Sequence, residues 1–469
     1  MAWQSDEPRP CRAATLTAMP ADETHDPNLK SWVESANDPA TDFPIQNLAL
    51  CAFERAHDGH AHDHMGVRIG EEVLDVSMLY ESGFFAGSEE IGMCLRIPYW
   101  AAIADRPTTW APLRSRLQQF LRADTHAGQQ ARRLRAKALV PARDLKFTPP
   151  VSTFNYTDFY ASKHHAANVG AMFRPDNPLL PNYRHVPIGY HGRASSIVVS
   201  GTDIHRPNGQ QAPAETEPKA LPMFGPCKML DYEMELALVV GARSRLGQPI
   251  AMKDARRHMF GVLILNDWSA RDIQKWEYQP LGPFLAKNFA TSVSPYVVTM
   301  AALEPFRIPG PERAGDDPTP LEYLRSQEDW GLDITCEVWL QSAQMRETGV
   351  APAMLSRGSF RHMYWTFAQM LVHHTSNGCN MHPGDLLGSG TVSGPEKSSR
   401  GCLLELTWEG NGPDAKPRPR TPVQLPTGET RTFLADGDEV IMKAYCEKEG
   451  FRRIGFGECR GRILPAPAV

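Results

Sequence analysis

Residues 230–240 read LDYEMELALVV, a run that predicts a buried strand carrying two acids. Its second half is wholly apolar, which indicates burial. Glu233 and Glu235 lie two positions apart, so on a strand their side chains point to the same face. Two like charges side by side on a buried strand are unfavourable unless a cation offsets them. The run therefore predicts a metal site. The ordinary alternative is that both acids lie on the solvent-exposed face of a half-buried strand.

A second acidic segment follows at residues 261–274, which read GVLILNDWSARDIQ. An apolar strand is predicted to end at Asp267, where a carboxylate is well placed to bind a metal. Four polar side chains, spaced i, i+4, i+7 and i+11, would share one face of a helix: Asp267, Arg271, Gln274 and Tyr278. Such a face would suit a metal-held substrate rich in oxygen atoms, whereas an exposed amphipathic face is the alternative.

The composition narrows the class of protein. A chain of 469 residues can form two or three domains, and its formal charge of -5 argues against nucleic acid as a partner. The 9 cysteines are scattered and form no CxxC pair, which is typical of reduced thiols in a cytoplasmic protein. We expect no membrane association, because no run approaches the ~18 apolar residues of a membrane span and the start lacks a signal-peptide core.

The order of patterns along the chain indicates a β-rich protein with few helices. Residues 1–28 are polar and aperiodic, so we expect a disordered extension. Short strands flank a polar loop between residues 43 and 76, and helical spacing predicts two helices between residues 110 and 139. Beyond residue 150 many short strands are expected between Gly and Pro positions, interrupted by one helix over residues 360–374.

Histidines gather in the polar loop, where residues 57–64 read HDGHAHDH. The tract resembles a transition-metal site. A surface turn without supporting residues favours a solvated loop instead, and we expect no catalytic role for its histidines, His57, His60, His62 and His64. His373 and His374 lie on the helix predicted over residues 360–374, where packed, hydrogen-bonded imidazoles are expected.

Several ordered blocks resemble the fumarylacetoacetate hydrolase family. They extend from about residue 42 to the end of the chain and read YTDFY at 156–160, PIGYHGRASS at 187–196, DYEME at 231–235, NDWSARDIQKWEY at 266–278, GPFLAK at 282–287, GDLLGSGT at 384–391 and GFGEC at 455–459. The resemblance implies a mainly β (α+β) fold: a small SH3-like β-barrel over residues 29–150 with helical connections, then a large mixed-strand β-roll over residues 151–469. It also implies a homodimer.

The resemblance implies a divalent cation, Ca2+ or Mg2+. Its ligands would be four carboxylates, Asp158, Glu233, Glu235 and Asp267. A set of oxygen ligands without Cys or His agrees with a hard cation. Their four negative charges exceed the two of the ion, so Arg271 and Lys287 are expected nearby. A second ion is implied beside Lys287 and Thr291.

The implied reaction is hydrolysis of a carbon–carbon bond, splitting fumarylacetoacetate into fumarate and acetoacetate. His165, oriented by Glu405 in a strand expected over residues 403–406, would activate water. Arg271, Gln274 and Lys287 would stabilise the oxyanion. Substrate-binding roles are implied for Tyr160, Arg174, Tyr190, Tyr278 and Thr391.

Two other functions stay open on the residues alone. A related metal-dependent hydrolase or decarboxylase could act on another acylpyruvate or β-keto acid, because acidic ligands do not choose the substrate. A calcium-stabilised, non-enzymatic binding protein could instead use the small β-domain as its binding module.

Overall fold

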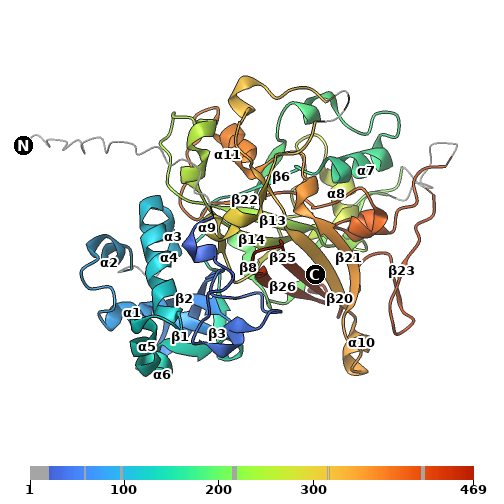
Figure 1. The fold of residues 1–469 in the computed structure, drawn as a ribbon. Coiled ribbons are helices and arrows are strands. Elements are labelled where there is room, and N and C mark those ends of the chain that lie inside the picture. Colours follow the sequence, from blue (N-terminus) through green and yellow to red (C-terminus); the bar gives the residue numbers. More distant parts are fainter. Residues whose placement is uncertain are drawn as a thin grey trace, which may run out of the picture.

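A computed structural model describes residues 21–57, 60–95, 99–213, 219–313, 315, 317–412 and 418–468. These residues form a strand-rich α+β fold in which an N-terminal lobe, blue to teal in Figure 1, lies beside a larger body. The first 20 residues of the extension expected to be disordered lie outside the described residues. From residue 21 on, the chain is packed: a 3-10 helix at Glu23–His25 buries His25, whose Nε2 lies 2.8 Å from the carbonyl oxygen of Ala301.

The N-terminal lobe is built on one antiparallel sheet of five strands in the order β4-β3-β2-β1-β5. The strands are β1 Leu50–His57, β2 His60–Ile69, β3 Glu72–Asp75, β4 Leu139–Pro141 and β5 Lys146–Thr148. The predicted hairpin is confirmed as β1 and β2, paired from Leu50–Val67 to His57–His60. This sheet is the scaffold on which the helices of the lobe pack.

Between β3 and β4 the described residues form six α-helices. They are α1 Val76–Glu81, α2 Glu89–Leu95, α3 Trp100–Ala104, α4 Pro107–Leu121, α5 His126–Ala131 and α6 Arg135–Ala138. The first of the two helices expected between residues 110 and 139 is α4, which begins with Pro107 at a position where proline is favoured. The second is broken into α5, a 3-10 turn at Arg132–Leu134, and α6.

The larger body is organised around an eight-stranded mixed sheet with the main order β7-β6-β22-β13-β14-β16-β8 and β17 paired to β14. Its strands are β6 Tyr156–Phe159, β7 Gly189–Gly192, β8 Ile197–Val199, β13 Met234–Val240, β14 Met259–Asp267, β16 Thr291–Val293, β17 Val298–Thr299 and β22 Leu386–Gly388. The pairs β22–β6 and β16–β8 are parallel, and the other pairs are antiparallel. Every residue of β13 and β14 is buried, as expected for strands covered on both faces.

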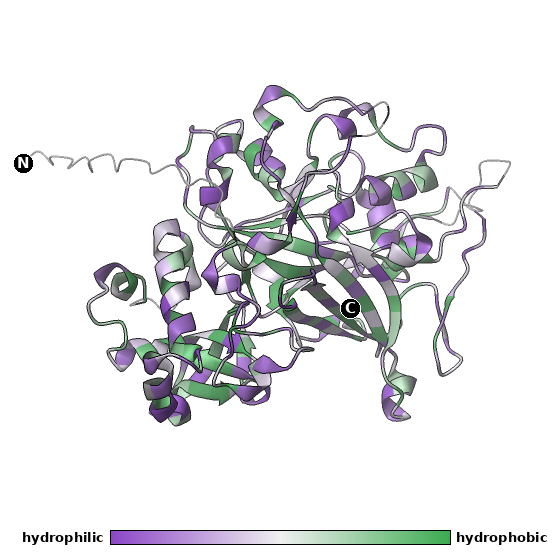
Figure 2. Cartoon of the chain, in the orientation of Figure 1, coloured by the Kyte–Doolittle hydropathy of each residue, from purple (hydrophilic) through white to green (hydrophobic). Residues whose placement is uncertain are grey.

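A second sheet of the body has the order β21-β20-β25-β26-β9. Its strands are β9 Ile204–His205, β20 Thr335–Gln341, β21 Ala353–Ser359, β25 Glu439–Cys446 and β26 Ile454–Leu464. Figure 2 shows hydrophobic residues concentrated on the strands of the body and hydrophilic residues on its outer turns. Trp268, fully buried after β14, packs against Gly461 of β26, so it joins the two sheets.

The remaining elements surround these sheets. The helices of the body are α7 Lys163–Phe173, α8 Arg271–Glu277, α9 Met300–Leu303, α10 Ala343–Glu347, α11 Phe367–Thr375 and α12 Leu403–Leu406. Two-stranded pairings add β10 Asn208–Gln211 with β11 Met223–Pro226, β12 Leu230–Asp231 with β15 Ser269–Ala270, β18 Arg307–Ile308 with β19 Gly331–Leu332, and β23 Val423–Gln424 with β24 Thr430–Arg431. The body is thus richer in helices than expected.

Three predicted elements differ from the structure. The run at residues 230–240 is not one strand, because it breaks after β12 and resumes as β13. The expected strand over residues 403–406 is the short helix α12, whose first N–H groups are bound by a distant side chain. The helix expected over residues 360–374 is a 3-10 turn at Phe360–His362 followed by α11, which starts at a capping box formed by Thr366 and Gln369.

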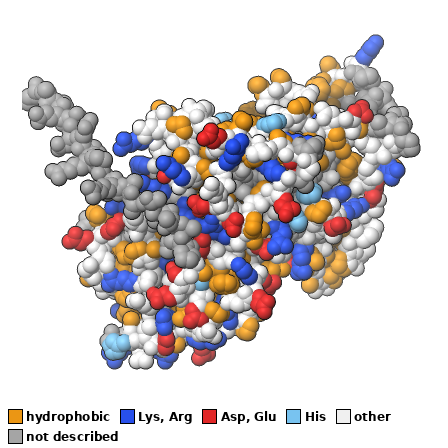
Figure 3. Space-filling model, turned by 45° about the horizontal axis from the view of Figure 1, so that its top comes forward, with side chains coloured by type: hydrophobic (Ala, Val, Ile, Leu, Met, Phe, Trp, Pro, Cys, Tyr) orange, Lys and Arg blue, Asp and Glu red, His pale blue; other side chains and the backbone are white. Residues whose placement is uncertain are grey.

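The surface carries charges of both signs. Figure 3 shows acidic and basic side chains interspersed with hydrophobic ones over the visible face. In the described part of the chain no helix combines the length and the apolar character that a membrane crossing requires.

We predict that Gly461→Ala destabilises the body. A Cβ atom at this position would lie 2.5 Å from Cζ2 of Trp268, a contact that forces one of the two sheets to move. Such overpacking costs about 1–3 kcal/mol of unfolding free energy, measurable by denaturant titration. Gly225→Ala on β11 is the matched control, because a Cβ atom there meets nothing within 4 Å. Equal stability of the two variants would contradict the packing role of Trp268.

Candidate active site

Four acidic side chains meet inside the eight-stranded sheet. Asp158 comes from β6, Glu233 from the break before β13, Glu235 from β13, and Asp267 from the end of β14. All four are buried, and one carboxylate oxygen from each lies within 4.8 Å of the others. The sheet order explains the gathering, because β22 pairs with both β6 and β13 and thereby brings these strands to one place.

Gly388 of β22 leaves room for this cluster. A Cβ atom at Gly388 would lie 2.8 Å from Oδ1 of Asp158 and 3.0 Å from Oε2 of Glu235. Any larger residue would therefore push the two carboxylates apart. The backbone N–H of Gly390 donates to the same pair, at 3.2 Å to Asp158 and 2.9 Å to Glu235. Residues 388–390 thus shape one wall of the site.

The carboxylates repel one another strongly. Burial raises the pKa of Asp158 and of Glu235 well above the ordinary range, and the neighbouring carboxylates raise both further. Burial also raises the pKa of Asp267. Oε1 of Glu235 is buried without a hydrogen-bond partner among the described residues. One orphaned carboxylate oxygen among four buried acids fits a hard divalent cation, which would supply the missing positive charge.

Two cations lie against one edge of the cluster. Nζ of Lys287 is 2.7 Å from Oε2 of Glu233 and 3.2 Å from Oδ2 of Asp267, and Nη1 of Arg271 is 2.7 Å from Oε1 of Glu233. Burial alone would raise the pKa of Glu233, but the charges of Lys287 and Arg271 lower it below the ordinary value. Thr291, expected beside a second ion, donates its hydroxyl to Oδ1 of Asp267 at 3.4 Å.

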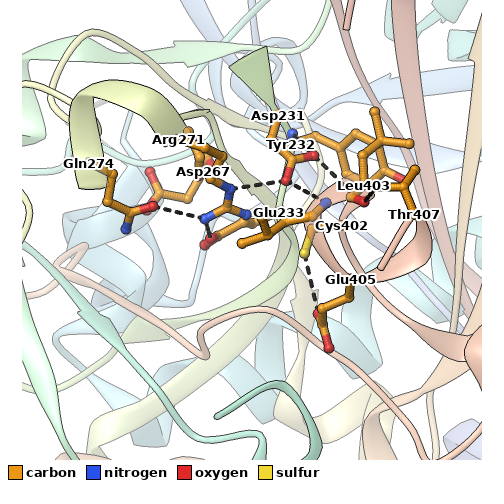
Figure 4. A network of polar contacts seen from close by, with 12 residues as sticks. Asp231, Tyr232, Glu233, Asp267, Arg271, Gln274, Cys402, Leu403, Glu405 and Thr407 are labelled. Carbon is orange, nitrogen blue, oxygen red and sulfur yellow. Dashed lines mark hydrogen bonds and ion pairs between the residues drawn. The ribbon is translucent and has the colours of Figure 1, made fainter. Parts of the chain in front are cut away.

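Arg271 connects the acidic cluster to the rest of the site (Figure 4). Its Nε donates to Asp231 at 3.0 Å, and its Nη1 donates to Oε1 of Gln274 at 3.1 Å as well as to Glu233. Its Nη2 is buried and has no hydrogen-bond partner among the described residues. The guanidinium therefore retains one donor for a further ligand.

The helical face expected from Asp267 to Tyr278 is wrong at its N-terminal end, whereas Tyr278 still donates its N–H to the carbonyl oxygen of Gln274 with helical backbone angles. Asp267 closes β14, and α8 begins only at Arg271. Tyr278 follows the last residue of α8, and its ring centroid lies 5.9 Å from that of Phe173. Arg271 and Gln274 do share the helix and are in contact.

His165 and Glu405 form a buried pair. Nδ1 of His165, in the first turn of α7, lies 2.5 Å from Oε2 of Glu405 on α12. Asn168 donates to the carboxylate at 2.7 Å and Ser393 at 2.8 Å. Burial alone would raise the pKa of Glu405, but the charge and hydrogen bond of His165, together with those donors, lower it to about 2. Glu405 is therefore an ionised acceptor that fixes one ring nitrogen of His165.

Of the side chains expected to bind substrate, Tyr160 and Tyr190 contact other residues of the site, whereas those of Thr391 and Arg174 form no hydrogen bond with them among the described residues. The ring of Tyr160 stands edge-on to His165 at 5.3 Å, and the hydroxyl of Tyr190 donates to Oδ2 of Asp267 at 2.7 Å. Oγ1 of Thr391 is buried without a partner among the described residues. Arg174 is the C-cap residue that follows α7, and its Nη2 donates to the carbonyl oxygen of Pro178 at 3.4 Å. Tyr160 thus lies against His165, and Tyr190 is bound to the carboxylate cluster.

Sequence reasoning missed several residues of the site. Asn168, Asp231, Ser393 and Cys402 contact Glu405 or Arg271, and Sγ of Cys402 lies 3.2 Å from Oε2 of Glu405. Asp231 belongs to the same acidic run as Glu233, so a third buried charge there was a visible signal. The other three show no pattern in the sequence.

The histidine tract is only partly a solvated loop. His60 and His62 are exposed, but His64 is buried, with its Nδ1 2.9 Å from Oδ2 of Asp75, which also pairs with Arg55 at 2.7 Å. Expecting a solvated His64 is wrong, because β2 runs on through the tract and turns this side chain inward. His373 and His374 are confirmed as hydrogen-bonded helix residues, to Tyr323 and Thr157.

We predict that Glu235→Gln weakens binding of Ca2+ by at least about 10-fold, because affinity follows the number of charged ligands. Without metal, the thermal midpoint should not fall, because the change removes a repulsive charge. Calorimetric titration and melting in chelator measure the two effects. Glu337→Gln, which changes a buried carboxylate bound by Arg357 elsewhere, should keep the affinity of the unaltered protein. Unchanged affinity in Glu235→Gln would remove Glu235 from the ligand set.

Comparison with known proteins places the chain in a family. The family described as "Fumarylacetoacetate (FAA) hydrolase C-terminal" matches residues 155–464, and "Fumarylacetoacetase N-terminal" matches residues 46–150. The fumarylacetoacetases of Bos taurus and Homo sapiens are each 44% identical over 440 residues, covering 93% of this chain and 99% of theirs. That of Oryza sativa subsp. japonica is 44% identical over 451 residues, covering 93% and 98%. The chain therefore belongs to the fumarylacetoacetate hydrolase family.

Proposed function

We propose that this protein is a metal-dependent hydrolase that splits fumarylacetoacetate into fumarate and acetoacetate, the last step of tyrosine and phenylalanine breakdown. The observation that carries this proposal is the joining of two functional groups in one buried network: the His165–Glu405 pair and the four-carboxylate cluster. Relatives of nearly the same length, each named fumarylacetoacetase, support the choice of substrate.

The four carboxylates of Asp158, Glu233, Glu235 and Asp267 would hold Ca2+ or Mg2+. Their all-oxygen chemistry and the orphaned Oε1 of Glu235 support a hard cation. When bound, the ion would supply Lewis-acid stabilisation of negative charge on the substrate's oxygens. Lys287 and Thr291, which touch Asp267, would lie beside a second ion.

His165 would act as the general base that takes a proton from water. Glu405 holds Nδ1 of the ring, which leaves Nε2 to accept that proton. General-base catalysis gives about 10²–10⁴-fold, so most of the acceleration must be electrostatic. The open Nη2 of Arg271 and the ammonium of Lys287 would stabilise the oxyanion, with Gln274 orienting Arg271 through its contact with Nη1.

Five side chains would then hold the substrate. Arg174 would pair with a carboxylate through its guanidinium, and the hydroxyls would bind keto and carboxylate oxygens: Tyr160, Tyr190, Tyr278 and Thr391. The unpartnered Oγ1 of Thr391 and Nε of Arg174 support these roles, because buried polar atoms need partners.

The finer architecture and the cellular setting are part of the proposal. Residues 29–150 would form an SH3-like barrel with helical connections, and residues 151–469 a β-roll that contains the site. The enzyme would act as a homodimer in the cytoplasm. Membership of the family supports the barrel, the roll and the dimer.

We predict that the purified protein, with Ca2+ or Mg2+, lowers the ultraviolet absorbance of fumarylacetoacetate and that excess chelator abolishes this activity. Acylpyruvates should be cleaved at least about 10-fold less efficiently, judged by kcat/KM. Preference for an acylpyruvate would favour the related β-keto acid hydrolase. Metal binding with no cleavage of either substrate would favour a calcium-stabilised binding protein.

We predict that Glu405→Gln lowers kcat by about 10²-fold or more while Ca2+ affinity stays unchanged, because only the orienter of the base is lost. Steady-state kinetics and calorimetry separate the two effects. Glu337→Gln again serves as the control for loss of a buried carboxylate. Normal turnover in Glu405→Gln would exclude Glu405 from the mechanism.

A further inference from the structure

Asp231 lies fully buried, and its carboxylate faces both Arg271 and Leu403 (Figure 4). Its Oδ1 accepts hydrogen bonds from the N–H groups of Tyr232 and Leu403, both at 2.9 Å. Its Oδ2 accepts from the N–H of Leu404 and from Nε of Arg271, both at 3.0 Å. One carboxylate therefore binds the helix that carries Glu405 and the guanidinium that faces the acidic cluster.

The placement of Glu405 depends on this carboxylate. The helix α12 has 4 residues, and Cys402 at its N-cap makes no side-chain capping bond. So short a helix has no stability of its own, because nucleation is unfavourable. Asp231, although distant in the sequence, caps this helix by accepting hydrogen bonds from the N–H groups of its first two residues. Glu405 is the third.

The orientation of Arg271 depends on the same carboxylate. Holding Nε fixes the plane of the guanidinium, which places Nη1 on Glu233 and leaves Nη2 free. Without Asp231, Arg271 could turn both of its outer nitrogens toward the acidic cluster, because a carboxylate prefers a two-pronged contact. The free donor would then be lost.

We propose that Asp231 is a positioning residue. It fixes the place of the His165–Glu405 base relative to the Nη2 group of Arg271 that would bind the oxyanion. Water activation and charge stabilisation happen at different side chains, and small misplacements between such groups are costly. This inference rests on the proposed function, in which both groups act in one reaction.

An asparagine at this position cannot replace the aspartate. All four partners of Asp231 are donors, two for each oxygen. An amide has only one acceptor oxygen, so in either orientation its NH2 group faces two N–H donors. Asp231→Asn therefore disrupts the network at constant side-chain size. Asp438→Asn is the matched control, because Asp438 is equally buried and binds Arg431 and the N–H of Ala435.

The kinetic test compares these variants. Asp231→Asn is expected to lower kcat by about 10²-fold with KM changed by less than about threefold, whereas Asp438→Asn keeps kcat per folded molecule. In a Glu405→Gln background the loss from Asp231→Asn should shrink at least about threefold, because part of it passes through Glu405. An equal loss in both backgrounds would show a merely structural role and overturn the inference.

A second measurement, by proton NMR, reports on the His165–Glu405 hydrogen bond without requiring catalytic turnover. The imidazole N–H of a histidine bound to a carboxylate gives a downfield proton resonance, assigned here by its absence in His165→Gln. We expect Asp231→Asn to shift or remove it and Asp438→Asn to retain it. If the resonance is unchanged in Asp231→Asn, the inference is overturned. If the resonance is lost in Asp231→Asn but the unaltered protein does not cleave fumarylacetoacetate, only the proposed function is refuted. Should Asp231→Asn not fold, Asp231→Glu, which moves both oxygens by one methylene, must give the same results.

Discussion

Mutual repulsion among four buried carboxylates is the constraint on which the rest of this structure depends. Burying even one unpaired carboxylate is costly, and like charges at this distance add to the cost. The protein offsets the repulsion only on one edge, where Lys287 and Arg271 hold Glu233 ionised. Neither Glu235 nor Asp158 forms an ion pair among the described residues, and Lys287 acts on Asp158 only through its more distant charge, which agrees with the proposed cation.

A rigid sheet holds the four carboxylates close together in spite of their repulsion. The fully buried strands β13 and β14 pair along seven positions, and β22 ties β13 to β6, so the backbone cannot relax to separate the acids. Gly388 removes the one side chain that would intrude, and Gly390 adds a backbone donor. Because sites on strands are held more precisely than sites on loops, the geometry persists in spite of the repulsion.

The sequence predicts those parts of the site that depend on local patterns. Glu233 and Glu235 are identified by the apolar run that follows them, Asp267 by the apolar run that it ends, and the hairpin by the short strands that flank a polar loop. Contacts between distant segments are not encoded locally. The capping of α12 by Asp231 joins residues more than 170 positions apart, so residues 403–406 resemble a strand until that contact is known. The burial of His64 is likewise not visible in the local pattern, because its partner Asp75 lies on another strand.

The hydrogen-bonding groups of Glu405 are largely occupied, whereas Arg271 and Glu235 each have an unoccupied one in the described part of the chain. This difference agrees with the roles proposed for them. Glu405 accepts from His165, Asn168 and Ser393 and also lies against Sγ of Cys402, so four side chains fix its position. Arg271 and Glu235 each keep one buried polar atom without a partner. A buried polar atom is costly unless something binds it during function. The fixed side of the site therefore holds His165 in one orientation, and the unsatisfied side is where we propose that cation and substrate bind.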